Sequence, residues 1–194
     1  MKVRVIASLV TALCLAGSAS ASSIGVFFAP DASDCDADGV QPFAPFFMYI
    51  GAVLGGDAAA PGISGAEFQC TGVDPAWFNT VTPNPVSNLA LGNPIAGGCN
   101  IAFPGCMVGG TGNFVLLYTI QSLALAPVTG RTLSVLQHTT PSNPNFLCPL
   151  VTLCDGPVFT KLCVSGGQAF LNLGRPCTVS VEQKSWSQVK SMFN

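Results

Sequence analysis

Charged side chains are scarce in this chain of 194 residues. They make up 8 % of the sequence, against about a quarter in an ordinary soluble domain. Seven Lys and Arg residues stand against nine Asp and Glu residues, which gives a formal net charge of −2. So few basic residues provide no electrostatic surface for a nucleic acid, and we predict that none is bound.

Histidine occurs once, at His138. One imidazole cannot supply a histidine-based zinc or copper site, and any Ser-His-Asp mechanism would have to use it. The chain has no G-x-S-x-G motif, so we interpret His138 as a histidine at the end of a strand. We predict that the protein is not an enzyme. The alternative is a secreted hydrolase with a carboxylate pair, for which Glu67 and Asp155 are candidates.

The N-terminus has the pattern of a secretory signal peptide. Lys2 and Arg4 precede an apolar run from Val5 to Ala16, and the small residues Ala19-Ser20-Ala21 follow it. The run is shorter than the roughly 20 residues that span a bilayer. We therefore predict cleavage after Ala21 and a mature chain, without a transmembrane segment, that is secreted or lies in the periplasm or at the cell surface.

Eight of the nine cysteines remain when Cys14 leaves with the signal peptide. An even number in an exported chain predicts four disulfides, and the lack of any C-x-x-C pair argues against a metal centre. Short separations favour local pairs, and the remaining cysteines then pair with each other. The predicted disulfides are Cys99–Cys106, Cys154–Cys163, Cys148–Cys177 and Cys35–Cys70.

Glycine and proline are abundant, at 21 and 15 residues. They separate short apolar runs from one another and argue against long helices. Candidate strands cover 24–28, 46–54, 65–71, 87–91, 98–103, 114–124, 132–139, 160–164 and 178–182. The run 65–71, GAEFQCT, alternates, which places Ala66, Phe68 and Cys70 on one face of the strand and Glu67 and Gln69 on the other. The spacing of the candidate strands predicts an all-β antiparallel β-sandwich of about seven to nine strands over residues 22–184. Ser185 followed by Trp186, Val189 and Phe193 at helical spacing predicts a short amphipathic C-terminal helix over 185–194.

An acidic loop near the N-terminus carries part of a calcium-binding pattern. Asp34, Asp36 and Asp38 take positions 1, 3 and 5 of a calcium loop, and the Val40 carbonyl takes position 7. Position 12 falls on Pro45, where a bidentate Glu belongs. The loop therefore predicts either a calcium site or a solvated turn, and calcium is the one cofactor that the sequence suggests.

Aromatic residues supply the candidate binding site. Trp77 and Phe78 follow a predicted strand, where binding residues tend to lie, and together with Tyr49 they could form a stacking platform for sugar rings. Core packing is the alternative role for each of them. We predict a non-catalytic structural or binding module that recognises a polysaccharide or a cell-surface protein. A calcium-stabilised surface or adhesion component is a further alternative.

Three segments of the chain resemble known proteins. They are the run 24–28, the run ending at residues 49–52 and the stretch 62–68, which reads GISGAEF. With the tail from Trp186 to Lys190, they are similar to a group of small exported bacterial β-sandwich proteins that have no assigned activity. More distantly, they resemble cohesin-like modules of bacterial surface assemblies. The resemblance implies an Ig-like or cohesin-like antiparallel β-sandwich and assigns no role to a particular residue.

The calcium interpretation of the acidic loop makes a direct prediction. Binding of Ca²⁺ to the folded chain would raise the midpoint of thermal unfolding, because a ligand that binds only the native state stabilises it. Melting curves recorded in calcium and in a chelator measure this shift. Equal midpoints would contradict the calcium site and leave the solvated turn.

Overall fold

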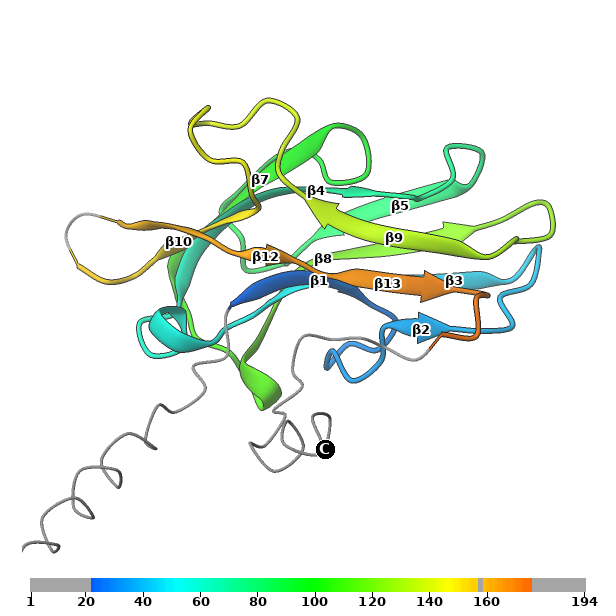
Figure 1. Ribbon diagram of the computed structural model, residues 1–194, viewed down its shortest axis with the longest axis horizontal. Helices are drawn as coiled ribbons and strands as arrows, with labels where there is room; N and C mark the ends of the chain where they lie inside the picture. The colour runs from blue at the N-terminus through cyan, green and yellow to red at the C-terminus, as the bar shows by residue number, and fades with distance from the viewer. Residues whose placement is uncertain (1–21, 157–158, 176–194) are drawn as a thin grey trace, which may run out of the picture.

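The apolar runs of the sequence form the strands of two β-sheets that pack face to face (Figure 1). The computed structural model describes residues 22–156 and 159–175. This part of the chain has 13 strands and two short 3₁₀ helices, η1 (Gly56–Ala58) and η2 (Thr111–Asn113). The predicted all-β sandwich is confirmed. The predicted signal peptide and C-terminal helix lie outside the described residues.

The first sheet has five strands and contains no charged residue. Its order is β12 (Ser165–Gly166), β1 (Ser23–Phe27), β3 (Pro45–Val53), β8 (Phe114–Leu123) and β5 (Phe78–Pro83). All neighbours pair antiparallel except β1 and β12, which pair in parallel.

The second sheet is larger and is organised around β4 (Ile63–Thr71). The main path runs β11 (Lys161–Cys163), β10 (Leu150–Leu153), β4, β9 (Arg131–Leu136), β13 (Gln168–Leu171) and β2 (Asp36–Ala37). Residues 63–67 of β4 pair with β10, whereas residues 69–71 pair with β9. On its other side β4 pairs with β7 (Gly98–Met107), and β7 pairs with β6 (Leu89–Asn93).

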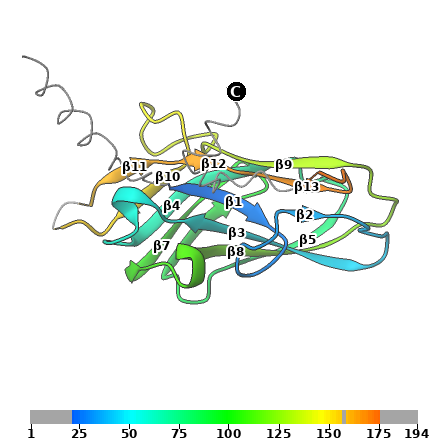
Figure 2. The ribbon, with the colours of Figure 1, turned by 60° about the horizontal axis from the view of Figure 1, so that its bottom comes forward.

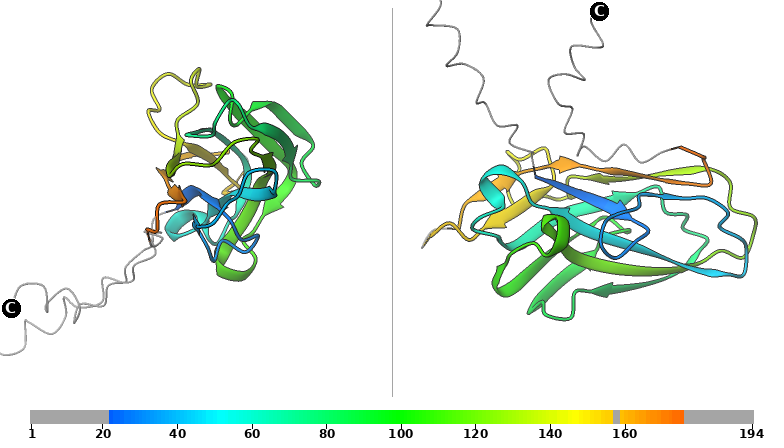
Figure 3. Two further views of the ribbon diagram at one scale, coloured as in Figure 1. Left: turned by 90° about the vertical axis from the view of Figure 1, so that its right-hand side faces the viewer. Right: turned by 90° about the horizontal axis from the view of Figure 1, so that it is seen from below.

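The core lies between the two sheets and is almost entirely aliphatic and aromatic. In Figure 2, β9 and β13 run above β3 and β8, and Figure 3 shows the same two layers from the end and from below. Strand alternation sends every second side chain inward. The largest fully buried side chains are Tyr118, Phe68, Ile24, Met48, Ile50, Leu54, Ile63, Leu117, Ile120, Leu133, Leu171 and Val26.

One short segment, residues 165–171, links the two sheets. Its first part pairs with β1 as β12, and its second part pairs with β9 as β13. A Cβ atom at Gly166 would lie 1.9 Å from the Val135 carbonyl oxygen, so only glycine allows the chain to pass this close to β9. The Gly167 N–H donates to the Ile24 oxygen, and the Gly167 oxygen accepts from the Val135 N–H. Both sheets are thus joined at this edge.

The described part contains more strands than the seven to nine that were predicted. The additional strands are short and lack a strong apolar alternation: β2, β5, β10, β12 and β13 have two to six residues each. These segments are held in strand conformation by their pairing with neighbouring strands and not by an intrinsic preference of their residues for strands. No helix in the described ranges is long and apolar enough to cross a membrane.

The disulfide pairing differs from the prediction. The structure joins Cys106 to Cys154 and Cys148 to Cys163, with Cα–Cα distances of 5.9 and 5.7 Å. The predicted pairs Cys99–Cys106, Cys154–Cys163 and Cys148–Cys177 are therefore wrong. Cys35 is also disulfide-bonded, whereas Cys70 is a free buried thiol, so the pair Cys35–Cys70 is wrong as well. Cys177 lies outside the described residues.

Strand register explains the observed pairs. Ile63 of β4 is paired with both Met107 of β7 and Leu153 of β10, so the chain neighbours of those two residues, Cys106 and Cys154, meet at the start of β4. Cys163 lies opposite Leu150 in the hairpin of β10 and β11, next to Cys148. Short sequence separation favoured disulfides within local loops. The observed disulfides instead join cysteines that strand pairing brings close together although they are distant in sequence.

Two aromatic rings cover glycines on the outer face of the five-stranded sheet. An added Cβ at Gly51 would lie 2.1 Å from the Phe114 ring and 2.8 Å from the Val115 carbonyl oxygen. Phe114 also contacts Phe27 edge-on, at 5.4 Å between ring centroids. The missing side chain at Gly51 is what lets Phe114 lie flat on the sheet and bury itself.

Substitution of Gly51 by Ala is expected to destabilise the fold by about 1–3 kcal/mol, the usual cost of overpacking. Gly105→Ala is the matched control, because Gly105 lies on a strand, is exposed and has no atom within 4 Å of an added Cβ. Denaturant unfolding of both variants measures the difference. Equal midpoints for the two would show that the Phe114 ring does not depend on Gly51.

Candidate functional site

Trp77, one of the three aromatics predicted to bind, packs inside the molecule. Its side chain is 9 % exposed and clusters with Ala124 and Leu171. The Phe46 ring contacts it edge-on, with centroids 5.4 Å apart. The Arg131 guanidinium carbon lies 5.4 Å from the indole centroid, which is a cation–π contact. Trp77 therefore has the packing role and does not present a free stacking face.

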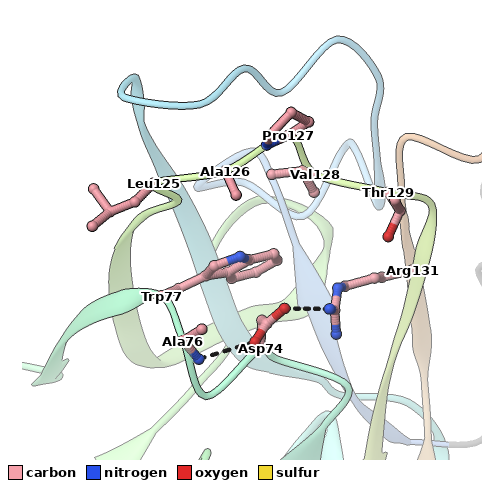
Figure 4. A pocket seen from close by; sticks show the side chains of 9 residues that line it. All are labelled: Asp74, Ala76, Trp77, Leu125, Ala126, Pro127, Val128, Thr129 and Arg131. Atoms are coloured by element: carbon pink, nitrogen blue, oxygen red, sulfur yellow. Dashed lines mark hydrogen bonds and ion pairs between the residues drawn. The ribbon is translucent and has the colours of Figure 1, made fainter.

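A small cavity lies beside Trp77 (Figure 4). The loop from Leu125 to Thr129 covers it, and Asp74 and Arg131 form an ion pair at its side. Its volume of about 120 Å³ holds a few water molecules and is well below the roughly 300 Å³ at which ligand pockets begin. Asp74 also accepts the Ala76 N–H at 2.9 Å, so this group fixes the turn after β4.

Phe78 and Tyr49 lie on the outer face of the five-stranded sheet, away from the Trp77 side chain. Phe78 is 63 % exposed, and Tyr49 stacks on Phe47 with centroids 6.5 Å apart. Phe78 is opposite Leu123 and Tyr49 is opposite Thr119, four positions further back along β8. The structure thus separates the three predicted aromatics instead of joining them in one platform.

The acidic loop uses several of its oxygens within the protein. The Asp34 carboxylate accepts the Asp36 N–H at 2.9 Å, and the Asp38 carboxylate accepts the Gly174 N–H at 3.0 Å. The Val40 carbonyl accepts from the Asn172 side chain at 3.1 Å. Desolvation raises the pKa of Asp36, and the carboxylates of Asp38 and Asp34 raise it further.

No group of three or more His, Cys, Asp or Glu side chains within the described ranges is placed to hold a metal ion. The calcium site at Asp34, Asp36, Asp38 and Val40 stays a prediction, and the hydrogen bonds that these residues already make would compete with it.

The larger cavity is a groove on the outer face of the second sheet. It encloses about 320 Å³ over β4, β7, β10 and the first residue of β6, within the range of ligand pockets. Its floor is Gly65, where an added Cβ would lie 2.7 Å from the Ile101 carbonyl oxygen. We call the surface made by the groove and the adjoining outer residues of β6 the groove face. Its side chains are Ser64, Glu67, Leu89, Leu91, Asn100, Ala102, Ser142, Leu150, Thr152 and Lys161.

Register brings these side chains together from distant parts of the chain. Glu67 lies between Leu150 of β10 and Asn100 of β7, and Asn100 is opposite Leu91 of β6. Gly65 lies likewise between Thr152 and Ala102, and Thr152 is opposite Lys161. The loop 137–149 between β9 and β10, yellow in Figure 1, brings Ser142 to the groove.

Glu67 and Lys161 are both linked to Ser142. The Glu67 carboxylate is 6 % exposed and accepts the Ser142 N–H at 2.9 Å. The Lys161 ammonium donates to the Ser142 hydroxyl at 2.9 Å. A buried carboxylate needs such partners, because burying a charge without them is costly. The three residues hold the loop against the sheet and place one acidic and one basic group in the groove.

The described residues of the groove form neither of two catalytic arrangements. A serine nucleophile paired with lysine needs a desolvated amine as its base, and Lys161 is exposed to solvent. A carboxylate-pair hydrolase would need a second acid near Glu67. Asp155, the other candidate, does not line the groove, and its carboxylate accepts the Thr160 N–H at 3.2 Å. Hydrogen bonds from the Thr160 side chain and, to a smaller extent, from its backbone N–H lower the pKa of Asp155.

The sequence placed Glu67 on a polar strand face but did not connect it to Ser142 or Lys161. The alternation of GAEFQCT is a sufficient signal for the first inference. The link of Glu67 to Ser142 and Lys161 depends on the pairing of four strands and on the path of a loop, which no local motif predicts.

Comparison with solved structures places the fold next to cohesin modules. A cohesin module from a family 33 glycoside hydrolase of Clostridium perfringens superposes with a TM-score of 0.53 at 10 % identity, covering 78 % of this chain and 96 % of the module. The sixth cohesin of scaffoldin B from Acetivibrio cellulolyticus, solved in complex with a Cel5 dockerin, gives a TM-score of 0.50 at 12 % identity, with coverages of 79 % and 99 %. No family model and no curated protein matches the sequence. Likeness at this identity shows the fold alone.

Replacement of Asp74 by Ala removes both the ion pair with Arg131 and the bond to the Ala76 N–H. We expect a loss of about 1–2 kcal/mol of unfolding free energy, since the pair is partly buried and the turn loses its acceptor. Asp31→Ala is the control, because Asp31 bonds only its near neighbour Ser33 in an exposed turn. Similar denaturation midpoints for both variants would rule out a structural role of the Asp74 pair.

Proposed function

We propose that this chain is a non-catalytic protein-binding module that contacts its partner through the groove face. The observation that carries the proposal is the groove itself, which combines a buried carboxylate, an exposed ammonium group and exposed leucines on one sheet. We further propose that the module acts outside the cytoplasm, which the disulfides of the fold support.

The composition of the groove face supports a protein partner. Leu89 and Leu91 of β6 are 49 % and 55 % exposed. Leu91 is opposite Asn100, and Leu89 lines the same groove as Thr152 and Lys161. Protein interfaces combine apolar contacts in a central patch with polar groups at its rim. A partner segment with an apolar side chain for the leucines and polar groups for Glu67 and Lys161 would complement this surface.

The cohesin likeness supports the same proposal at the level of the fold. One of the two solved cohesins was determined as a complex with a dockerin, a protein partner. A β-sandwich of this architecture can therefore bind another protein. The choice of the groove face for the present chain rests on its own cavity and exposed side chains.

Carbohydrate recognition is a second candidate, favoured by a different surface. Phe47 and Tyr49 are stacked, and Phe78 is exposed, on the outer face of the five-stranded sheet. A sugar ligand would bind there and not in the groove, so the location of binding separates the two candidates.

A photo-crosslinking amino acid such as benzoylphenylalanine at position 89 tests the proposal in the organism that makes the protein. The probe at position 89 is expected to form a covalent adduct with one protein. The same probe at position 43 is the matched control, because Phe43 is 72 % exposed in a loop outside the groove. We expect Leu91→Asp to lower the yield at position 89 at least about tenfold, since loss of a central contact costs 1.4 kcal/mol or more.

Three results would contradict the proposal: no adduct at position 89, the same adducts at both positions, or an adduct at position 89 that Leu91→Asp leaves unchanged. Binding of a soluble glycan that is abolished by Phe78→Ala, with no adduct at position 89, would favour the second candidate.

A further inference from the structure

Two of the described cysteines, Cys70 and Cys99, are not disulfide-bonded. Cys70 is 3 % exposed and Cys99 is fully buried, and both are thiols in the structure. Cys70 belongs to β4 and Cys99 to β7, strands that pair antiparallel. Both side chains belong to the core between the two sheets.

Register makes the two cysteines diagonal neighbours. Cys99 is opposite Phe68, and Cys70 is two residues further along β4 on the same inward face. Diagonal residues of an antiparallel pair lie roughly 7–8 Å apart at Cα and closer at Cβ, while disulfides join Cα atoms up to about 7 Å apart. By these general distances, a shift of roughly 1 Å would bring the two Cα atoms within disulfide range.

The backbone next to Cys99 is suited to such a shift. The regular ladder of β4 and β7 ends at the pair of Phe68 and Cys99, and the Cys70 N–H donates instead to the Pro94 oxygen at 2.7 Å. Gly97 and Gly98 precede Cys99, and both have positive φ angles, of 96° and 114°. Glycine tolerates changes of φ and ψ that other residues do not.

A buried hydroxyl lies beside the pair. Tyr118 of β8 is 2 % exposed, and its hydroxyl oxygen has no hydrogen-bond partner in the described part of the chain. The Tyr118 ring contacts the Phe68 ring edge-on, and its hydroxyl is close enough to the Cys99 thiol for the two groups to affect each other's pKa. A disulfide sulfur has no proton, so it can only accept a hydrogen bond. Such an acceptor would suit the Tyr118 hydroxyl, which has none among the described residues.

We propose that Cys70 and Cys99 form a further disulfide in the oxidised protein, a cross-link between β4 and β7 inside the core. Cys35, Cys106, Cys148, Cys154 and Cys163 are already bonded, and the fold places the remaining two described cysteines next to each other. This inference does not depend on the proposed function.

The reaction is a thiol–disulfide exchange with a small disulfide or a disulfide oxidoreductase as the oxidant. The two thiols lose two electrons and two protons as the new S–S bond forms, and the donor disulfide is reduced to two thiols. Burial raises the pKa of both Cys70 and Cys99 to about 12 in the folded chain. Because the thiolate is the reactive form, the bond forms before the core closes around the two sulfurs.

Thiol counting tests this proposal. The full chain, secreted by an oxidising host, is denatured without reductant in the presence of iodoacetamide, and its intact mass is measured. We expect no adduct on the cysteines of the mature chain, and a cross-linked peptide that contains Cys70 and Cys99 after digestion. Adducts on Cys70 and Cys99 would overturn the proposal, whatever the state of the other cysteines.

Two variants make the result independent of incomplete oxidation. Cys70→Ala should expose one thiol, so the number of adducts should rise from none to one, at Cys99. Cys70→Ala/Cys99→Ala should return it to none. If both cysteines are free in the native chain, the number should instead fall from two in the wild type to one and then to none. From the wild type to Cys70→Ala, the number of adducts thus rises if the disulfide exists and falls if both cysteines are free.

Discussion

The pairing of β4 determines most of what this structure can do. Its inward side chains, Ala66 and Phe68 among them, enter the core, while Gly65 and Glu67 face outward. It pairs with β10 and β9 on one side and with β7 on the other. A slip of one residue would place the Glu67 carboxylate in the aliphatic core and Phe68 on the surface. The register of β4 is therefore strongly specified, and it fixes which side chains line the groove.

Scarcity of charge shapes the rest of the fold. In the described ranges one salt bridge forms, between Arg131 and Asp74. Stability comes instead from the apolar core and from covalent links that hold loops rich in glycine and proline. Three carboxylates, those of Glu67, Asp34 and Asp38, accept hydrogen bonds from backbone N–H groups. These bonds order turns that have few apolar contacts of their own.

The sequence predicted the sandwich because its longest apolar runs, now β1, β3 and β8, can only be buried between two sheets. It predicted the outward face of Glu67 from strict alternation in β4. It did not predict the disulfide pairs, because Cys106 and Cys154 are 48 residues apart and meet only through the register of three strands. It left two roles open for Trp77, sugar binding and core packing, because the loop from Leu125 to Thr129 that lies over this side chain is distant in sequence. Local patterns determine elements, and pairing between distant elements determines sites.

The groove face lies on a part of the molecule that a disulfide and two side-chain hydrogen bonds constrain. The Cys106–Cys154 bond joins the strands on both sides of β4, and the Glu67–Ser142–Lys161 contacts fix the loop above it. A surface that is already ordered loses little conformational entropy on binding, so more of the contact energy appears as affinity. With one acidic and one basic side chain in the groove, long-range attraction of the proposed partner would be weak. Specificity in such a complex would depend on the short-range fit of apolar and hydrogen-bonding groups, and affinity would depend on the rate of dissociation more than on that of association.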